Sequence, residues 1–110
     1  MDPVADQLEA YNERDIDRFL SCYHPNVIIE DGEGNLLMEG HEAMRAQYSS
    51  LFDSSPSLHA HLMSRIVVGN YVIDEEDVTG MKAEGSPDRL HSVAIFKVDS
   101  EKIVHARFYW

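Results

Sequence analysis

The chain has 110 residues, of which 44% are hydrophobic and 26% are charged, and this predicts one folded domain rather than a disordered chain. The formal net charge of −11 disfavours nucleic acid and anionic lipid surfaces as partners. No stretch approaches the roughly 18 apolar residues of a membrane span, and the N-terminus does not resemble a signal peptide. Cys22 is the one cysteine, so no internal disulfide is expected, and we expect a cytoplasmic protein.

The N-terminal half of the sequence predicts three helices. Residues 2–11 begin with Asp-Pro, a suitable cap and first turn, and continue with apolar residues at helical spacing. Asp15 can cap a second helix, whose apolar stripe includes Tyr23 and which Pro25 ends. Residues 41–54 repeat the helical period.

The remaining segments predict strands. Residues 26–31 and 35–40 are short apolar runs on either side of a glycine-rich turn, which is typical of a hairpin. No helical stripe follows Leu58, and turn residues separate four long runs, at 58–68, 71–81, 90–98 and 102–110. Helices in the first half and a strand meander in the second indicate an α+β fold, with helices covering one face of a curved sheet.

This order of elements resembles the cone-shaped, cystatin-like α+β barrel of nuclear transport factor 2, the SnoaL-like polyketide cyclases and ketosteroid isomerase. The text of residues 11–48, "YNERDIDRFLSCYHPNVIIEDGEGNLLMEGHEAMRAQY", and the closing "KIVHARFYW" are similar to the ketosteroid isomerase pattern. The resemblance implies that residues 1–110 form one nuclear transport factor 2-like (SnoaL-like) domain, with three N-terminal helices packed on a strongly curved, mostly antiparallel sheet. It also implies a homodimer formed through the outer face of the sheet.

The resemblance further implies a site. Asp31 falls where the isomerases keep their general base, and Tyr48 matches a pocket tyrosine. Gln7 and Ala94 stand where those enzymes have the tyrosine and the aspartic acid that stabilise the enolate oxygen, so these two donors are not matched. The expected activity is isomerase-like proton transfer next to a carbonyl group, with Asp31 as the base and no cofactor.

We expect a cavity for a small, mostly apolar organic ligand. In the last strand Val104 and the alternate residues after it share one face, which in the resembled fold lines the cone, although simple filling of the core explains the same pattern. The predicted pocket residues are Gln7, Tyr11, Leu20, Tyr23, Tyr48, Phe52, Ala94, Phe96, Ala106, Phe108 and Trp110.

Three alternatives stay open. Asp31 precedes a glycine and is equally suited to a turn in which its carboxylate binds its own backbone. The chain could be a non-catalytic ligand-binding or dimerisation module, because this architecture hosts both kinds of protein. Histidines that share a strand face could bind a metal, but alternation on the outside of a sheet produces the same spacing, so no metal is expected; these are His59, His61, His91 and His105.

The segment "IDEED", residues 73–77, concentrates acidic side chains in a predicted strand. Alternation sends Asp74 and Glu76 to one face of that strand, with Ile73, Glu75 and Asp77 on the other, so at least one carboxylate could face the cavity or the dimer surface. We interpret the segment mainly as a solvated edge or loop. A buried acid would need a cation, and Arg65 and Arg107 are the available partners.

Overall fold

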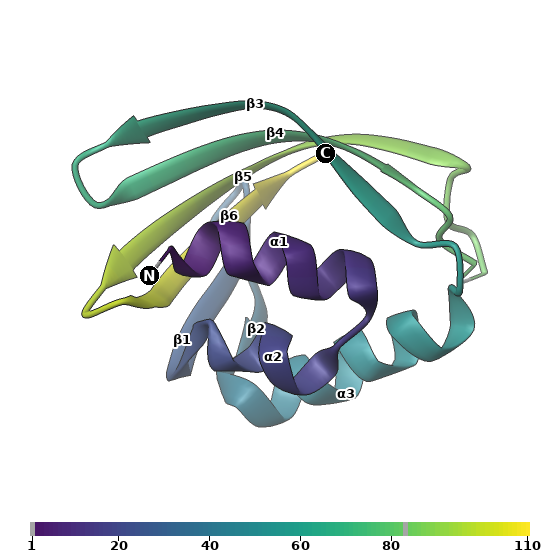
Figure 1. Ribbon diagram of the computed structural model, residues 1–110, viewed down its shortest axis with the longest axis horizontal. Helices are drawn as coiled ribbons and strands as arrows, with labels where there is room; N and C mark the ends of the chain where they lie inside the picture. Colours follow the sequence, from purple (N-terminus) through teal and green to yellow (C-terminus); the bar gives the residue numbers. More distant parts are fainter. Residues whose placement is uncertain (1, 83) are drawn as a thin grey trace.

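The computed structural model describes residues 2–82 and 84–110, which form three helices packed on a curved six-stranded sheet (Figure 1). The predicted α+β class, with three N-terminal helices on a mostly antiparallel sheet, is confirmed. The elements are α1 (Pro3–Glu13), α2 (Ile16–Ser21), β1 (Tyr23–Asp31), β2 (Leu36–Glu39), α3 (Gly40–Ser54), β3 (His59–Val68), β4 (Tyr71–Thr79), β5 (Arg89–Asp99) and β6 (Lys102–Tyr109).

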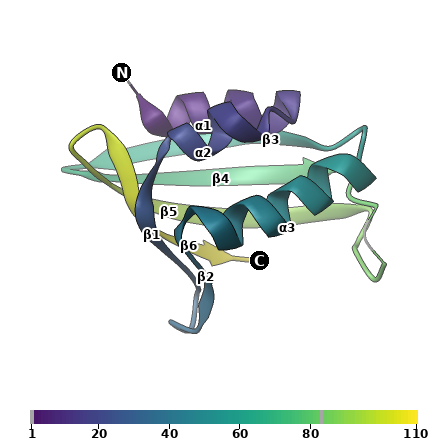
Figure 2. The ribbon, with the colours of Figure 1, turned by 90° about the horizontal axis from the view of Figure 1, so that it is seen from below.

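The strands are arranged in the order β2-β1-β6-β5-β4-β3. Every neighbouring pair is antiparallel except β1 and β6, which run parallel. The last strand therefore lies between the first strand and the β3–β5 meander, and joins them. The sheet bends over the helices, and α2 packs between α1 and α3 on its concave side (Figures 1 and 2).

Capping side chains fix the start of the first two helices. The Asp2 carboxylate accepts hydrogen bonds from the backbone N–H groups of Val4 and Ala5, both at 3.1 Å, and Asp15 accepts one from Arg18 N–H at 3.2 Å. Both caps confirm the sequence prediction.

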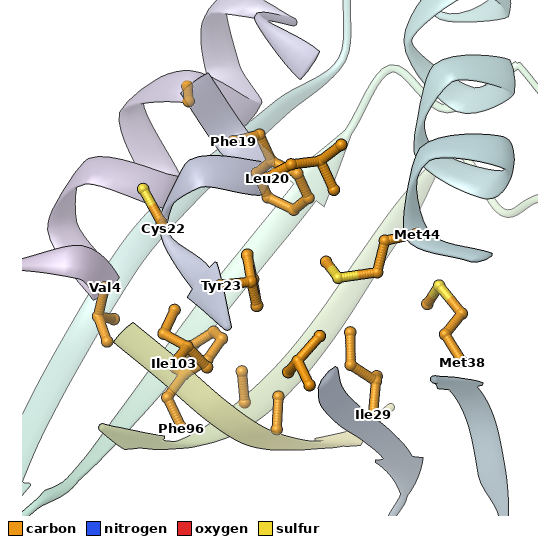
Figure 3. Close-up of a cluster of buried hydrophobic side chains, with 14 of the residues drawn as sticks. Val4, Phe19, Leu20, Cys22, Tyr23, Ile29, Met38, Met44, Phe96 and Ile103 are labelled. Carbon is orange, nitrogen blue, oxygen red and sulfur yellow. The ribbon is translucent and has the colours of Figure 1, made fainter. Parts of the chain in front are cut away.

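One hydrophobic core fills the space between the helices and the sheet. Phe19 and Tyr23 are almost completely buried, and their ring centroids are 5.1 Å apart. Figure 3 shows Tyr23 between Met44 of α3 and the strand residues Phe96 and Ile103, with Phe19 beside Leu20. A side-chain clamp attaches α1 to the sheet: the Asn12 amide donates to Ala60 C=O at 3.0 Å and accepts from Ala60 N–H at 2.7 Å.

Two local predictions are wrong. Helix α2 ends at Ser21, so Tyr23 is the first residue of β1 rather than part of a helical stripe, and Pro25 lies inside β1. In β6 a register shift opposite Lys97 and Val98 interrupts the alternation, and Ile103 rather than Val104 is fully buried. Within the described residues, no helix is long and apolar enough to cross a membrane.

Candidate functional site

A cavity of about 260 Å³ lies between the helices and the concave face of the sheet. Side chains from all three helices line it, together with side chains from all six strands. Aromatic and aliphatic residues make up most of its surface, as in sites for small organic molecules. Trp110 is 68% exposed, which places it at the mouth.

The structure brings most of the predicted pocket residues to this cavity and leaves four elsewhere. Those on its walls are Gln7, Tyr11, Tyr23, Tyr48, Phe96, Phe108 and Trp110. Leu20, Phe52, Ala94 and Ala106 are buried in the surrounding core without lining the cavity. Ala94 lies opposite Asp74 of the neighbouring strand, in the second layer of the wall.

The structure places Asp31 outside this cavity, at the last residue of β1, where the chain enters the turn that leads to β2. Its carboxylate accepts hydrogen bonds from the backbone N–H groups of Glu33 and Asn35, both at 2.9 Å, and from the Asn35 amide at 3.0 Å. The Asn35 side chain, followed by these backbone groups, lowers the pKa of Asp31. This is the geometry of the turn alternative, and a carboxylate stabilised in its charged form is a poor proton acceptor.

Glu76 of β4 is the acidic group that lines the cavity. Burial, and then the negative charge of Asp74, raise the pKa of Glu76 from 4.5 to about 7, while Arg65 acts in the opposite direction. Among the described lining residues it is the only charged one, and no lysine, arginine or histidine shares the wall. The cavity therefore contains one carboxyl group that exchanges its proton near neutral pH, in an otherwise apolar setting.

Polar side chains of α1, β1 and α3 share the cavity with that carboxyl group. The Tyr23 hydroxyl donates to Gln7 Oε1 at 2.9 Å, and the Gln7 amide donates to Val4 C=O at 3.2 Å. Tyr11 and Tyr48 also line the cavity, and neither hydroxyl makes a hydrogen bond to the described part of the chain. Burial raises the pKa of both tyrosines, so their hydroxyls stay protonated and are available as donors.

Behind Glu76 lies a buried ion pair. Asp74 is 0% exposed and accepts two hydrogen bonds from Arg65, Nε to Oδ1 at 2.7 Å and Nη2 to Oδ2 at 2.9 Å. Arg65 was one of the two expected partners for a buried acid. The other, Arg107, donates instead to Glu30 at 3.1 Å.

The sequence-based interpretation of residues 73–77 was wrong for Asp74 and Glu76. The segment lies in β4, which β3 and β5 flank on both sides, so it is not an edge or a loop. The available signal was alternation: Asp74, Glu76 and Val78 share a face, and Val78 is buried.

The four histidines do not converge. His59 and His61 are exposed on β3, His91 contacts Glu75, and His105 contacts Glu30. In the described part of the chain, no three metal-ligating side chains form a cluster.

The model of the SnoaL-like domain matches residues 4–106. The chain belongs to the SnoaL-like domain family. The resemblance to the nuclear transport factor 2-like and ketosteroid isomerase-like fold is thereby confirmed.

Solved structures support this SnoaL-like assignment. An uncharacterized cystatin-fold protein from Novosphingobium aromaticivorans is 27% identical, with a TM-score of 0.88 over 98% of this chain and 97% of that one. A polyketide cyclase-like protein from Sinorhizobium meliloti is 18% identical (TM-score 0.79; 96% and 92% covered).

A ketosteroid isomerase-like protein from Catenulispora acidiphila, in complex with trimethylamine, is 15% identical (TM-score 0.80; 98% and 84% covered). The last two similarities show the fold alone. No protein of curated function matches the sequence. Proteins of this fold thus include some described as enzymes and others that are uncharacterised, and the site itself has to carry any functional argument.

Proposed function

We propose that this SnoaL-like protein is an acid–base enzyme that moves a proton next to the carbonyl group of a small, mostly apolar, uncharged molecule. The observation that supports this is Glu76, a single carboxyl group on the wall of an apolar cavity with a pKa of about 7. A general base works best when its pKa lies near the working pH, because it then accepts and returns a proton with similar ease.

Each part of the reaction has a candidate group. The Glu76 carboxylate accepts the proton from the carbon next to the carbonyl and returns it at a new position. The protonated hydroxyls of Tyr11 and Tyr48 donate hydrogen bonds to the carbonyl oxygen as negative charge develops there. The wall lacks cationic side chains among its described residues, which favours uncharged over anionic substrates.

The test is hydrogen–deuterium exchange of a panel of small cyclic ketones, followed by NMR. Wild type should accelerate exchange for ketones that fit the cavity, and Glu76→Gln should remove the acceleration. Glu75→Gln is the matched control, since Glu75 is the preceding residue on the opposite face of β4, where it contacts Ser64 and His91. Exchange that survives Glu76→Gln would rule out this assignment, and exchange lost in Asp31→Asn alone would restore Asp31 as the base.

The alternative function is a non-catalytic binding protein, and one finding gives it a specific ligand class. The similar protein from Catenulispora acidiphila is in complex with trimethylamine. Here, aromatic rings and one carboxyl group would suit a small alkylammonium ion. Titration calorimetry with trimethylammonium tests this: such binding should tighten as the pH rises through about 7, because Glu76 becomes charged. If trimethylammonium binds Glu76→Gln as tightly as wild type, this alternative function is excluded.

We also infer that two copies associate through the outer face of the sheet. Cross-strand pairing aligns Ile66, Ile73, Ile95 and Arg107 in one row on the face opposite the cavity, and Ile66 is 57% exposed. Sedimentation analysis should find a dimer that Ile73→Lys dissociates. A wild type that stays monomeric at high concentration would contradict this.

The cytoplasmic location predicted for the protein fits its one buried thiol, that of Cys22.

A further inference from the structure

The Arg65–Asp74 pair is placed so that it can act on Glu76. Arg65 of β3 and Asp74 of β4 are direct cross-strand partners, and the guanidinium binds both carboxylate oxygens, at 2.7 and 2.9 Å. A bidentate contact of this kind fixes the plane of both groups. Asp74 is completely buried, and the Arg65 side chain is 22% exposed.

Glu76 is two residues farther along the same strand. Side chains two apart on a strand project from the same face about 7 Å apart, so the two carboxyl groups are neighbours on the concave side of β4. The cross-strand neighbour of Asp74 on β5 is Ala94, which has only a methyl group and offers no hydrogen bond. Among the described contacts of Asp74, Arg65 is therefore what balances its charge.

We propose that Arg65 and Asp74 act as a positioning pair for Glu76, and that the balance between their charges controls how readily Glu76 gives up its proton. This inference rests on the role of Glu76 in the proposed function.

The surrounding charges support the proposal. Asp74 raises the pKa of Glu76 and Arg65 lowers it, after the larger effect of burial. The other titratable groups close enough to interact with the Glu76 charge are Tyr11 of α1, Tyr48 of α3 and Tyr23 of β1. Burial raises the pKa of all three, so they stay neutral when Glu76 titrates. Arg65 also lies 4.0 Å from the carboxylate of Asp2, which is 61% exposed. Asp74 is therefore its buried partner, and the pair supplies the adjustable charge beside Glu76.

The proposal makes opposite predictions for the two members of the pair. Arg65→Met keeps the apolar stem but leaves Asp74 uncompensated, so the pKa of Glu76 should rise by roughly one pH unit. Asp74→Asn keeps the shape but removes the negative charge, so the pKa should fall by a similar amount. The double variant Arg65→Met/Asp74→Asn should return towards the wild-type value.

The experiment is a pH titration of the Glu76 side-chain carboxyl carbon by NMR, with the signal assigned by its loss in Glu76→Gln. Arg89→Met is the matched control, because Arg89 forms an ion pair with Asp77 on the opposite face of the same strand. It should leave the Glu76 titration unchanged. If a single variant fails to fold, Arg65→Lys replaces it, because lysine keeps the charge but loses the bidentate contact. Arg65→Lys should raise the pKa of Glu76 by less than is expected for Arg65→Met.

Shifts of opposite sign in the two single variants, cancelling in the double variant, would support the pair. Unchanged titration, or shifts of the same sign, would overturn it and leave the pair a purely structural contact. Because the titration needs no substrate, it separates this inference from the proposed function. A wild type that does not accelerate ketone exchange would refute the enzyme while leaving the coupling measurable.

Discussion

Replacing Glu76 by glutamine should change how stability depends on pH. Glu76 has a pKa of about 7 in the folded protein against 4.5 for an ordinary glutamate, so the folded state holds a proton that the unfolded state has already released between these values. Wild type therefore loses stability as the pH rises from about 4.5 to above 7. The pKa difference corresponds to about 3 kcal/mol. Glutamine has nearly the same shape and no charge, so Glu76→Gln avoids this loss.

The assay is urea unfolding of wild type and Glu76→Gln at about pH 4.5 and about pH 8.5. At the acidic pH the two proteins should be similarly stable, and at the alkaline pH the variant should be more stable by about 3 kcal/mol. The difference between the two proteins cancels the contribution of the other titrating groups, and Glu75→Gln controls for the loss of a surface charge. If the difference in unfolding free energy between wild type and Glu76→Gln is the same at both pH values, folding does not raise the pKa of Glu76 and the argument is refuted.

Three further predictions concern the core, a turn and Asp31. Phe19→Ala should lower the unfolding free energy by about 3–5 kcal/mol, because Phe19 is 1% exposed; a loss below about 1 kcal/mol in urea unfolding would show a loosely packed core. Gly80 and Gly85 have φ angles of 82° and 80°, so alanine at Gly85 should cost about 1–2 kcal/mol of backbone strain. Alanine at Gly80 should cost more, because its methyl group meets the Ser57 carbonyl group, and equal melting temperatures for the two variants would contradict this. Asp31→Asn should weaken the turn at neutral pH, with the loss of stability disappearing in acid as the wild-type carboxylate is protonated, and should leave the Glu76 NMR titration unchanged.

The sequence predicted the elements well because local chemistry determines them. Asp2 and Asp15 cap helices, and turn residues separate the long strands. The end of α2 was misjudged because Tyr23 continues the helical spacing, although tertiary contacts place it at the start of a strand paired with β6. Periodicity carries no information on such non-local pairing.

The site was harder to predict than the fold. The position of Asp31 in the family pattern suggested a base, but the neighbouring Asn35 and the backbone engage its carboxylate in the turn. Glu76 lies in a run of acidic residues of the kind that is typical of solvated segments, so the sequence did not single it out. Its role depends on β4 being an inner strand, and that is a property of sheet order, which a single sequence does not reveal.

The position of β6 has a consequence for the order in which the molecule can assemble. The strand follows all the other strands along the chain, yet it joins the β1–β2 hairpin to the rest of the sheet, and Phe108 near its end forms part of the cavity wall. A growing chain on the ribosome can form its helices and the β3–β5 meander before β6 emerges, but ligand binding has to wait until β6 has paired. A pairing partner so distant along the chain also favours slow folding.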